Sequence, residues 1–163
     1  MNDVAAEVIA RATTGGITIA TAESLTAGLV AASLADVPGA SSVLQGGIVS
    51  YQVSVKQNLL GVDATLLAEA GAVDPRVAAA MARGVRTVLD ADIGLATTGV
   101  AGPSAHGGKP VGTVFTAVST ARRTVISEHH FTGDRGTIRA VSRDAVLADL
   151  LEELLRGTNG PVG

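Results

Sequence analysis

The sequence predicts an α/β fold around a mixed sheet, and two observations support this. Short apolar segments rich in β-branched residues alternate with longer segments of helical periodicity, which is the pattern of α/β layers. Near the C-terminal end, two apolar segments, 111–119 and 124–131, are joined through Ala121-Arg122-Arg123 and predict a hairpin. The hairpin makes the sheet mixed, while the other strands, which alternate with helices, keep it mostly parallel.

Strands are predicted over 17–22, 43–51 and 93–97, because each is short and apolar. Gly46-Gly47 indicates a bulge or a close backbone approach in the second of them. Residues 37–40 are predicted to form a loop.

Five segments have the features of helices. The first ends at Gly15-Gly16, the next cover 25–35 and 53–60, the fourth starts with Asp74 as N-cap and Pro75, and the last follows 133–136. Three buried faces are predicted: Val4, Ala5, Val8, Ile9 and Ala12; Val77, Met81, Val85 and Val88; and Leu147, Leu150, Leu151 and Leu154.

Length and composition favour one domain. Of the 163 residues, 47% are hydrophobic and 17% charged, which suits a well-covered sheet. We expect a single domain over 1–157 and a flexible tail over 158–163, where Gly, Asn and Pro accumulate.

Charge and hydropathy limit the partners. The net charge of −3 offers no basic surface for nucleic acid. No apolar run reaches the roughly 20 residues of a membrane span, and the N-terminus lacks the pattern of a signal peptide. We therefore expect a cytoplasmic protein with no nucleic-acid or membrane partner; a homo-oligomer is compatible with so apolar a chain.

The absence of cysteine excludes disulfides, thiolate zinc sites and a cysteine nucleophile. Nucleophilic catalysis then needs Ser, Thr, Lys or a carboxylate. His106, His129 and His130 lack the spacing of a zinc site, so no metal and no cofactor is predicted.

Ser24 is the first candidate for chemistry, because it stands between a predicted strand and a predicted helix. There its hydroxyl would face the carboxyl end of the sheet, and N–H groups of the following helix would lie near a developing oxyanion. The alternative is that Ser24 only caps that helix.

Lys56 is one of two lysines against ten arginines, and a buried lysine, unlike arginine, can lose its proton and act as a base. Tyr51, the only tyrosine, ends a predicted strand, where it could relay a proton or stack on a planar heterocycle. The alternatives are a solvated lysine on a helix and a half-buried strand aromatic.

Two further features suit an anionic ligand. The glycine-rich stretch 99–112 follows a strand and lets backbone amides approach an anion, although it matches neither GxxxxGK[ST] nor GxGxxG. Arg135 and Arg139 share a face at the start of the last helix and could hold a phosphate. An ordinary connection and solvated arginines are the alternatives.

Several blocks together resemble the CinA C-terminal domain family. Their order in the chain is that of the family, and they cover nearly all of it. The matching blocks are Ala22-Glu23-Ser24-Leu25-Thr26, Ser50-Tyr51 with Lys56 and 59–62, Gly71-Ala72-Val73, the blocks 98–103 and 109–114, and Gly133-Asp134-Arg135.

The resemblance implies a three-layer α/β/α sandwich that hydrolyses nicotinamide mononucleotide to nicotinate mononucleotide and ammonia. By position, Ser24 would be the nucleophile and Lys56 its general base, with Tyr51 and Thr98 completing the active site. The additional N-terminal domain of many relatives is not expected here. Substrate contacts are expected from Thr26, Gly99, Ala101, Gly102, Lys109, Arg135 and Arg139.

The chain departs from the family pattern at four places. Ala27 stands where a glycine is usual, Gln52-Val53 replaces a common Ser-Asn pair, and Ser104-Ala105-His106 is particular to this chain. Asp74 replaces a frequent serine, but both residues are N-caps, so the structural role is kept. Two other functions stay open: a nucleotide-binding module without catalysis that acts in competence or DNA-damage responses, as the family name suggests, and an amidase or esterase for another small substrate.

Overall fold

The computed structural model describes residues 3–158, and the tail predicted to be flexible lies outside them apart from Thr158. Strands and helices alternate before a final hairpin and helix. The elements are α1 (Asp3–Gly15), β1 (Ile19–Glu23), α2 (Leu29–Ala35), the 3₁₀ turn η1 (Ala40–Ser42), β2 (Leu44–Val49), α3 (Val53–Leu60), α4 (Ala64–Ala70), α5 (Pro75–Val88), β3 (Ile93–Gly99), β4 (Thr113–Ser119), β5 (Thr124–His130) and α6 (Arg135–Thr158).

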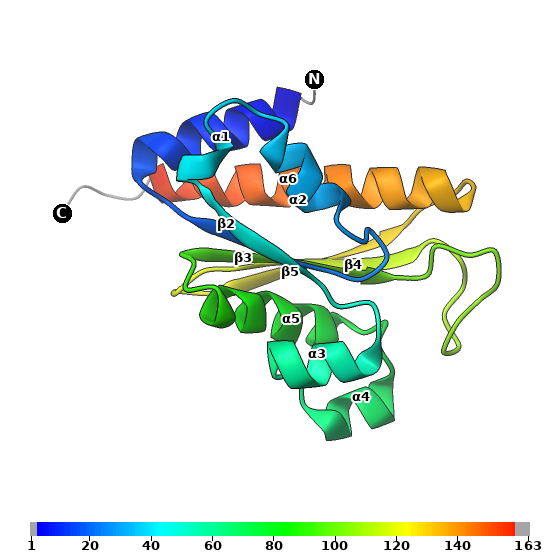
Figure 1. The fold of residues 1–163 in the computed structure, drawn as a ribbon. Helices are drawn as coiled ribbons and strands as arrows, with labels where there is room; N and C mark the ends of the chain where they lie inside the picture. The colour runs from blue at the N-terminus through cyan, green and yellow to red at the C-terminus, as the bar shows by residue number, and fades with distance from the viewer. Residues whose placement is uncertain (1–2, 159–163) are drawn as a thin grey trace.

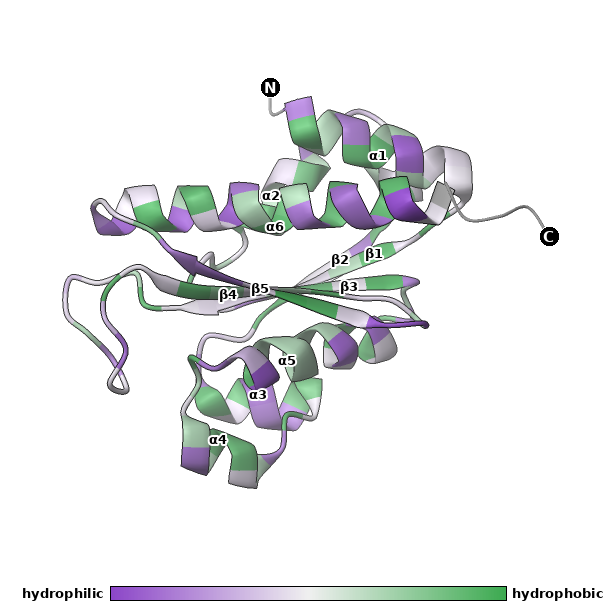
Figure 2. Ribbon diagram, turned by 180° about the vertical axis from the view of Figure 1, so that it is seen from behind, coloured by the Kyte–Doolittle hydropathy of each residue, from purple (hydrophilic) through white to green (hydrophobic). Residues whose placement is uncertain are grey.

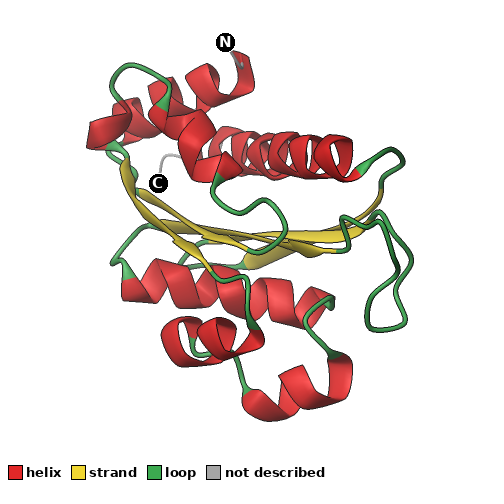
Figure 3. Cartoon of the chain, turned by 45° about the vertical axis from the view of Figure 1, so that its right-hand side comes forward, coloured by secondary structure: helices red, strands yellow, loops and turns green. Residues whose placement is uncertain are grey.

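The described strands form one sheet in the order β2-β1-β3-β4-β5. β1 pairs parallel with β2 and β3, whereas β4 pairs antiparallel with β3 and β5, so that β4 alone runs against the other four. Helices α1, α2 and α6 cover one face, and α3, α4 and α5 lie on the other (Figures 1 and 3). The predicted α/β sandwich with a mixed, mostly parallel sheet is confirmed.

The core lies in two layers, one on each side of the sheet. Ile19 of β1 packs with Val8 and Leu147 against α1 and α6, whereas Ala20 packs on the opposite side with Met81 of α5. Successive strand residues face opposite layers, so a strand covered on both sides must be apolar throughout. Figure 2 shows this sheet from behind, between the two helical layers.

The carboxyl ends of three parallel strands meet at one edge of the sheet. Glu23, the last residue of β1, pairs with Val49 at the end of β2 and with Thr97 near the end of β3. The segments that follow these strands therefore lie together, although they are far apart in sequence. In α/β sheets this edge is where ligands bind.

Local sequence signals explain several element ends. α3 ends at Gly61, because its φ of 66° lies in the left-handed region and cannot continue a right-handed helix. Asp74 caps α5 by accepting the N–H of Arg76 at 2.8 Å. In β2 the register shifts beside Gly46-Gly47, and a Cβ on Gly47 would lie 2.5 Å from Thr21 Oγ1. The predicted bulge and close approach are both present.

Three expectations from the sequence are wrong. The helix predicted over 25–35 begins only at Leu29, because the chain first turns through Ala27 and Gly28 with φ of 47° and 101°. α4 was not expected; it has seven residues, too few to display periodicity. Val88 was expected on the buried face of α5 but is 53% exposed.

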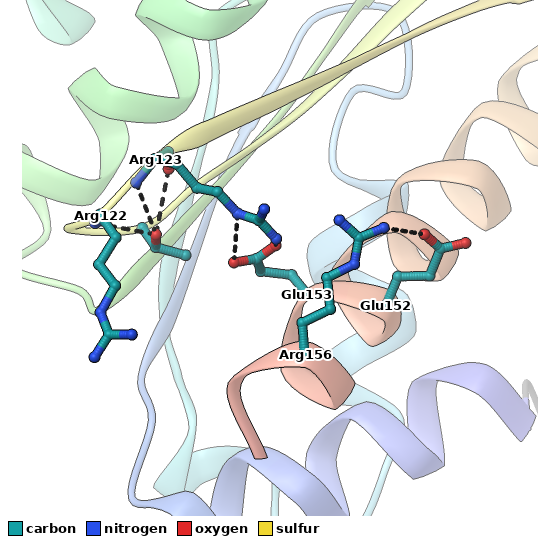
Figure 4. Close-up of polar contacts among 6 residues, drawn as sticks. Arg122, Arg123, Glu152, Glu153 and Arg156 are labelled. Carbon is teal, nitrogen blue, oxygen red and sulfur yellow. Dashed lines mark hydrogen bonds and ion pairs between the residues drawn. The ribbon is translucent and has the colours of Figure 1, made fainter. Parts of the chain in front are cut away.

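One ion pair connects the turn between β4 and β5 to α6: Arg123 of the turn contacts Glu153 at 2.5 Å (Figure 4). Arg156 contacts Glu152 at 3.4 Å within α6 itself. Exposed pairs of this kind contribute at most about 1 kcal/mol each, so the Arg123–Glu153 pair positions the turn more than it stabilises the fold.

α6 is the longest helix of residues 3–158, and charged residues occur along it. Within this range no helix is both long and apolar enough to traverse a bilayer. Nor does any group of three or more His, Asp or Glu side chains in this range have the arrangement of a metal site.

Candidate active site

Ser24 follows β1 at the edge of the sheet where the parallel strands end. Its N–H donates to the Thr97 carbonyl of β3 at 3.0 Å, which extends the strand pairing by one residue. The turn that follows separates Ser24 from the first residue of α2. The serine is thus held by the sheet at the end of a rigid strand, and it does not cap a helix.

Glu23 holds the other side of this turn. Its carboxylate is 1% exposed and accepts the N–H groups of Gly28, Val30 and Ala31 at 2.9, 3.1 and 2.9 Å. These are N–H groups at the start of α2, which have no partner within the helix. Because they are bonded to Glu23, they do not serve an oxyanion at Ser24, as the sequence had suggested.

Two other N–H groups remain beside Ser24. The backbone N–H groups of Leu25 and Thr26 have no hydrogen-bond acceptor within residues 3–158. They belong to the two residues directly after the serine. Leu25 also lines the pocket that contains Ser24, whereas Thr26 is buried behind it.

Lys56 of α3 brings an amine to the serine. Its Nζ lies 3.0 Å from Ser24 Oγ, 2.5 Å from the Ser50 carbonyl oxygen and 3.3 Å from the Tyr51 carbonyl oxygen. The side chain is fully buried. All three neighbours of the amine are uncharged oxygens, so no carboxylate holds its proton.

Burial lowers the pKa of Lys56 from 10.5 to about 8, because the charged form loses its hydration. About a tenth of the amine is therefore neutral at pH 7, far more than for an exposed lysine. A neutral amine has a lone pair and can accept a proton. Ser24 and Lys56 thus have the contact of a nucleophile and its base, and the lowered pKa makes the basic form accessible.

A pocket of about 500 Å³ opens over Ser24 and Lys56. Its basic side chains are Lys56, His106 and Arg135, and no Asp or Glu belongs to the lining. The net charge of the chain is −3, whereas the Arg135 guanidinium has no carboxylate beside it in the pocket lining. The lining consists of Ser24, Leu25, 51–53, Lys56, Ala72, Val73, 98–106 and Arg135.

Tyr51 and Arg135 meet at the mouth of this pocket. Arg135 donates to Tyr51 Oη and to the Gly102 carbonyl, both at 2.7 Å. Through these hydrogen bonds, Arg135 at the start of α6 contacts both the segment that follows β2 and the glycine-rich stretch. Tyr51 is 50% exposed, so its ring is accessible to a ligand.

Thr98 lies deeper and donates its hydroxyl proton to the Ala72 carbonyl at 2.7 Å. Its oxygen is therefore left to accept a hydrogen bond from the pocket. Gly99, Ala101 and Gly102, which the resemblance also places at the substrate, line the same pocket.

Three residues expected to contact the substrate do not line the pocket. Thr26 is buried, and its hydroxyl is bonded to Thr97 Oγ1 at 2.7 Å. Arg139 donates to the Leu25 and Thr26 carbonyls. Lys109 lies near Asp74, where its charge helps to lower the pKa of that carboxyl, although Arg76 has the larger effect.

A model of the CinA C-terminal domain matches residues 1–154. The chain belongs to the CinA C-terminal domain family. The CinA-like proteins of Frankia casuarinae and Geobacter sulfurreducens are similar to it, with 51% identity over 140 residues and 45% over 141. Each alignment covers 86% of this chain but only 32% and 34% of the relative. The chain therefore spans about a third of the length of the curated relatives it matches.

Solved structures of the family share the fold over nearly their whole length. The competence/damage inducible protein CihA from Agrobacterium tumefaciens is 33% identical, with a TM-score of 0.89 over 92% of this chain and 93% of that one. The competence damage-inducible protein A (ComA) from Klebsiella pneumoniae is also 33% identical, with a TM-score of 0.91 over 94% and 96%.

Two of the places where this CinA domain departs from the family pattern line the pocket directly: Gln52-Val53 and Ser104-Ala105-His106. A third, Ala27, lies in the turn after Ser24 and adopts the left-handed conformation that the usual glycine would adopt without strain. The glycine-rich stretch thus contributes side chains as well as backbone to the site.

The sequence did not reveal the residues that support the site. Glu23, the Ser50 carbonyl and the Ala72 carbonyl all hold a site residue or its turn. Two are backbone atoms, for which residue type gives no signal. For Glu23 a signal existed, since an acid directly before Ser24 ends an otherwise apolar strand.

Proposed function

We propose that this chain hydrolyses the carboxamide of nicotinamide mononucleotide, giving nicotinate mononucleotide and ammonia. The observation that carries the proposal is the 3.0 Å contact between Ser24 Oγ and the Nζ of a fully buried Lys56. A serine with a neutral lysine as base is suited to acyl transfer. The choice of this amide rests on the family resemblance, on the basic side chains of the pocket and on its size.

The surroundings of Lys56 suit the removal of a proton from Ser24. A neutral amine has two N–H bonds and one lone pair. The carbonyls of Ser50 and Tyr51 can accept hydrogen bonds from the two N–H groups. The lone pair is then left for the Ser24 hydroxyl. After transfer, the ammonium donates to the same carbonyls and to the serine oxygen, so neither state leaves a buried donor unpaired.

The reaction then takes two steps. Ser24 Oγ attacks the amide carbon while Lys56 takes its proton, and the tetrahedral intermediate collapses as Lys56 gives that proton to the departing ammonia. Water next attacks the acyl ester, with Lys56 again taking a proton and returning it to Ser24. The balance requires only water, and Ser24 and Lys56 end as they began.

The free N–H groups of Leu25 and Thr26 are the proposed donors to the oxyanion. They follow the nucleophile directly in the chain, as the donors of serine hydrolases often do. One such donor contributes on the order of 3 kcal/mol to the stabilisation of the transition state. Thr98, whose hydroxyl oxygen is free to accept, would orient the amide N–H₂ of the substrate.

The pocket is compatible with a mononucleotide. Its volume of about 500 Å³ falls within the range of sites for small ligands. Arg135 uses two of its five N–H groups on Gly102 and Tyr51, and the other three have no hydrogen-bond partner within residues 3–158. We assign these to the phosphate and the exposed Tyr51 ring to the planar heterocycle.

The test is ammonia release from nicotinamide mononucleotide, free nicotinamide and glutamine, measured side by side. We expect the mononucleotide to react fastest, and Ser24→Ala to abolish release while the fold persists by circular dichroism. Ser54→Ala is the matched control, because it removes a nearby exposed serine hydroxyl that does not line the pocket.

Each alternative function gives a different outcome. Binding of the mononucleotide without ammonia release would indicate a nucleotide-binding module. Faster release from another amide would assign the same Ser24–Lys56 pair to a different substrate. Undiminished turnover in Ser24→Ala would exclude the mechanism altogether.

A further inference from the structure

The segment after Gly102 forms a small hairpin beside the pocket. The N–H of His106 donates to the Lys109 carbonyl at 3.1 Å, and the N–H of Lys109 donates back at 2.9 Å. Between them, Gly107 and Gly108 have φ of 56° and 74°. Two positive φ values in a two-residue loop are typical of a type I′ turn. The turn therefore fixes the backbone of His106 next to the pocket.

His106 is the ionisable side chain of the lining that nothing else engages. Lys56 is buried against three oxygens, and Arg135 is bonded to Tyr51 and Gly102. The imidazole of His106 has no hydrogen-bond or ion-pair partner within residues 3–158, and it is exposed in the pocket wall. Lys109, its neighbour across the turn, does not line the pocket.

The surroundings of His106 favour an anion. No carboxylate lines the pocket, so an anionic group there meets no negative neighbour in the lining. Arg135 bonds the carbonyl of Gly102, the residue where the segment leading to the hairpin begins. His106 and Arg135 therefore line the same pocket from two segments, the one after Gly102 and the start of α6, that are linked by the Arg135–Gly102 hydrogen bond.

We propose that His106 is a specificity-determining residue that donates an imidazole N–H to the phosphate of the substrate, together with Arg135. The assignment of phosphate rests on the proposed function, whereas the contact with an anion rests on the pocket alone. A phosphate offers several acceptor oxygens, enough for both side chains. The contact distinguishes the mononucleotide from its riboside, which has the same carboxamide without the phosphate.

The experiment is calorimetric binding to Ser24→Ala, which retains the pocket and cannot turn over the ligand by the proposed mechanism. The probes are nicotinamide mononucleotide, nicotinamide riboside and ribose 5-phosphate. His106→Gln in this background should raise the Kd of both phosphorylated probes by about threefold to tenfold, the value of one hydrogen bond, and leave the riboside unchanged. His106→Lys should restore most of the lost affinity.

His130→Gln is the matched control, since it makes the same change at an exposed histidine of β5 outside the pocket. Equal Kd values for His106→Gln and its parent would overturn the proposal. Lys109→Gln is measured in the same way, and a loss of affinity for the phosphorylated probes in this variant alone would also overturn it. An equal loss for the riboside would show that His106 contacts another part of the ligand. Ammonia release by the wild-type chain is measured separately, so a failure of catalysis and a failure of this contact remain distinct.

Discussion

The guanidinium of Arg139 donates to the backbone carbonyl of Leu25 at 2.8 Å, across 114 residues of sequence. A second N–H of the same group reaches the Thr26 carbonyl at 3.2 Å. α6 thus holds the two residues that follow the nucleophile, whose N–H groups are the proposed oxyanion donors. Arg139 is placed to position the turn, although its spacing from Arg135 had suggested a phosphate ligand.

Arg139→Ala should therefore lower kcat about tenfold and change KM for the mononucleotide less than twofold. The reason is that loss of a charge-assisted hydrogen bond costs about 1.5 kcal/mol, and here that cost falls on transition-state geometry. Steady-state ammonia release measures both constants. Arg143→Ala, one turn further along α6, removes an arginine bonded to Asp144 and is the control. A raised KM with unchanged kcat would instead return Arg139 to the phosphate.

The pH dependence of catalysis should report Lys56. Its pKa, lowered to about 8 by burial, leaves about a tenth of the amine neutral at pH 7. Because the neutral form is the base, kcat/KM should rise about tenfold from pH 6 to 7 and level off above pH 8. Stopped assays of ammonia release across pH 6–10 measure the profile. A flat profile through this range would remove Lys56 as the base.

The same pKa makes a prediction about folding. Lys56 has a pKa of 10.5 when exposed and about 8 when folded, so between these values the unfolded chain binds more protons. Raising the pH through this interval therefore stabilises the native state, by about 3 kcal/mol in total. Below pH 8 this gain is absent, because both states carry the proton.

The measurement compares the unfolding free energy of the wild type with that of Lys56→Met in urea at pH 7.5 and 10.5. The unfolding free energy of the wild type should rise relative to that of Lys56→Met at the higher pH. The other titrating groups are common to both proteins, so their effects cancel in the difference. A pH-independent difference would mean that Lys56 titrates alike in the folded and unfolded chains.

Local rules predicted those parts of the molecule that local interactions determine. α3 and its end at Gly61, and the Asp74 cap of α5, follow from helix signals a few residues long. The meeting of Ser24 and Lys56 also follows, because one stands after β1 and the other after β2, and parallel neighbouring strands end at one edge.

The rest depends on contacts between distant segments, which no local pattern encodes. The start of α2 is moved to Leu29 by a turn that Glu23 and Arg139 hold from both sides. Lys109 has the charge expected of a phosphate ligand, yet the hairpin leaves it near Asp74 and puts His106 in the pocket wall. Residue type predicted that a basic side chain would contact an anion, and the tertiary structure determines which basic side chain lines the pocket.

Ala27 has a φ of 47°, a conformation that costs an alanine about 1–2 kcal/mol and glycine almost nothing. Ala27→Gly should therefore stabilise the chain by about 0.5–1 kcal/mol, even though glycine has the larger entropy in the unfolded state. The urea midpoint of unfolding should rise with an unchanged slope. Since Glu23 and Arg139 hold the turn on both sides, kcat should stay within about twofold of the wild type.

Ala10→Gly is the control, because Ala10 is an exposed residue within α1 and is not among the alanines with positive φ. There the same change should destabilise the chain by about 0.5–1 kcal/mol, since only the entropy of the unfolded state changes. Opposite signs at the two positions would establish that Ala27 is strained. Destabilisation at both would mean that the turn after Ser24 stores no strain, and that an alanine fits there as well as glycine.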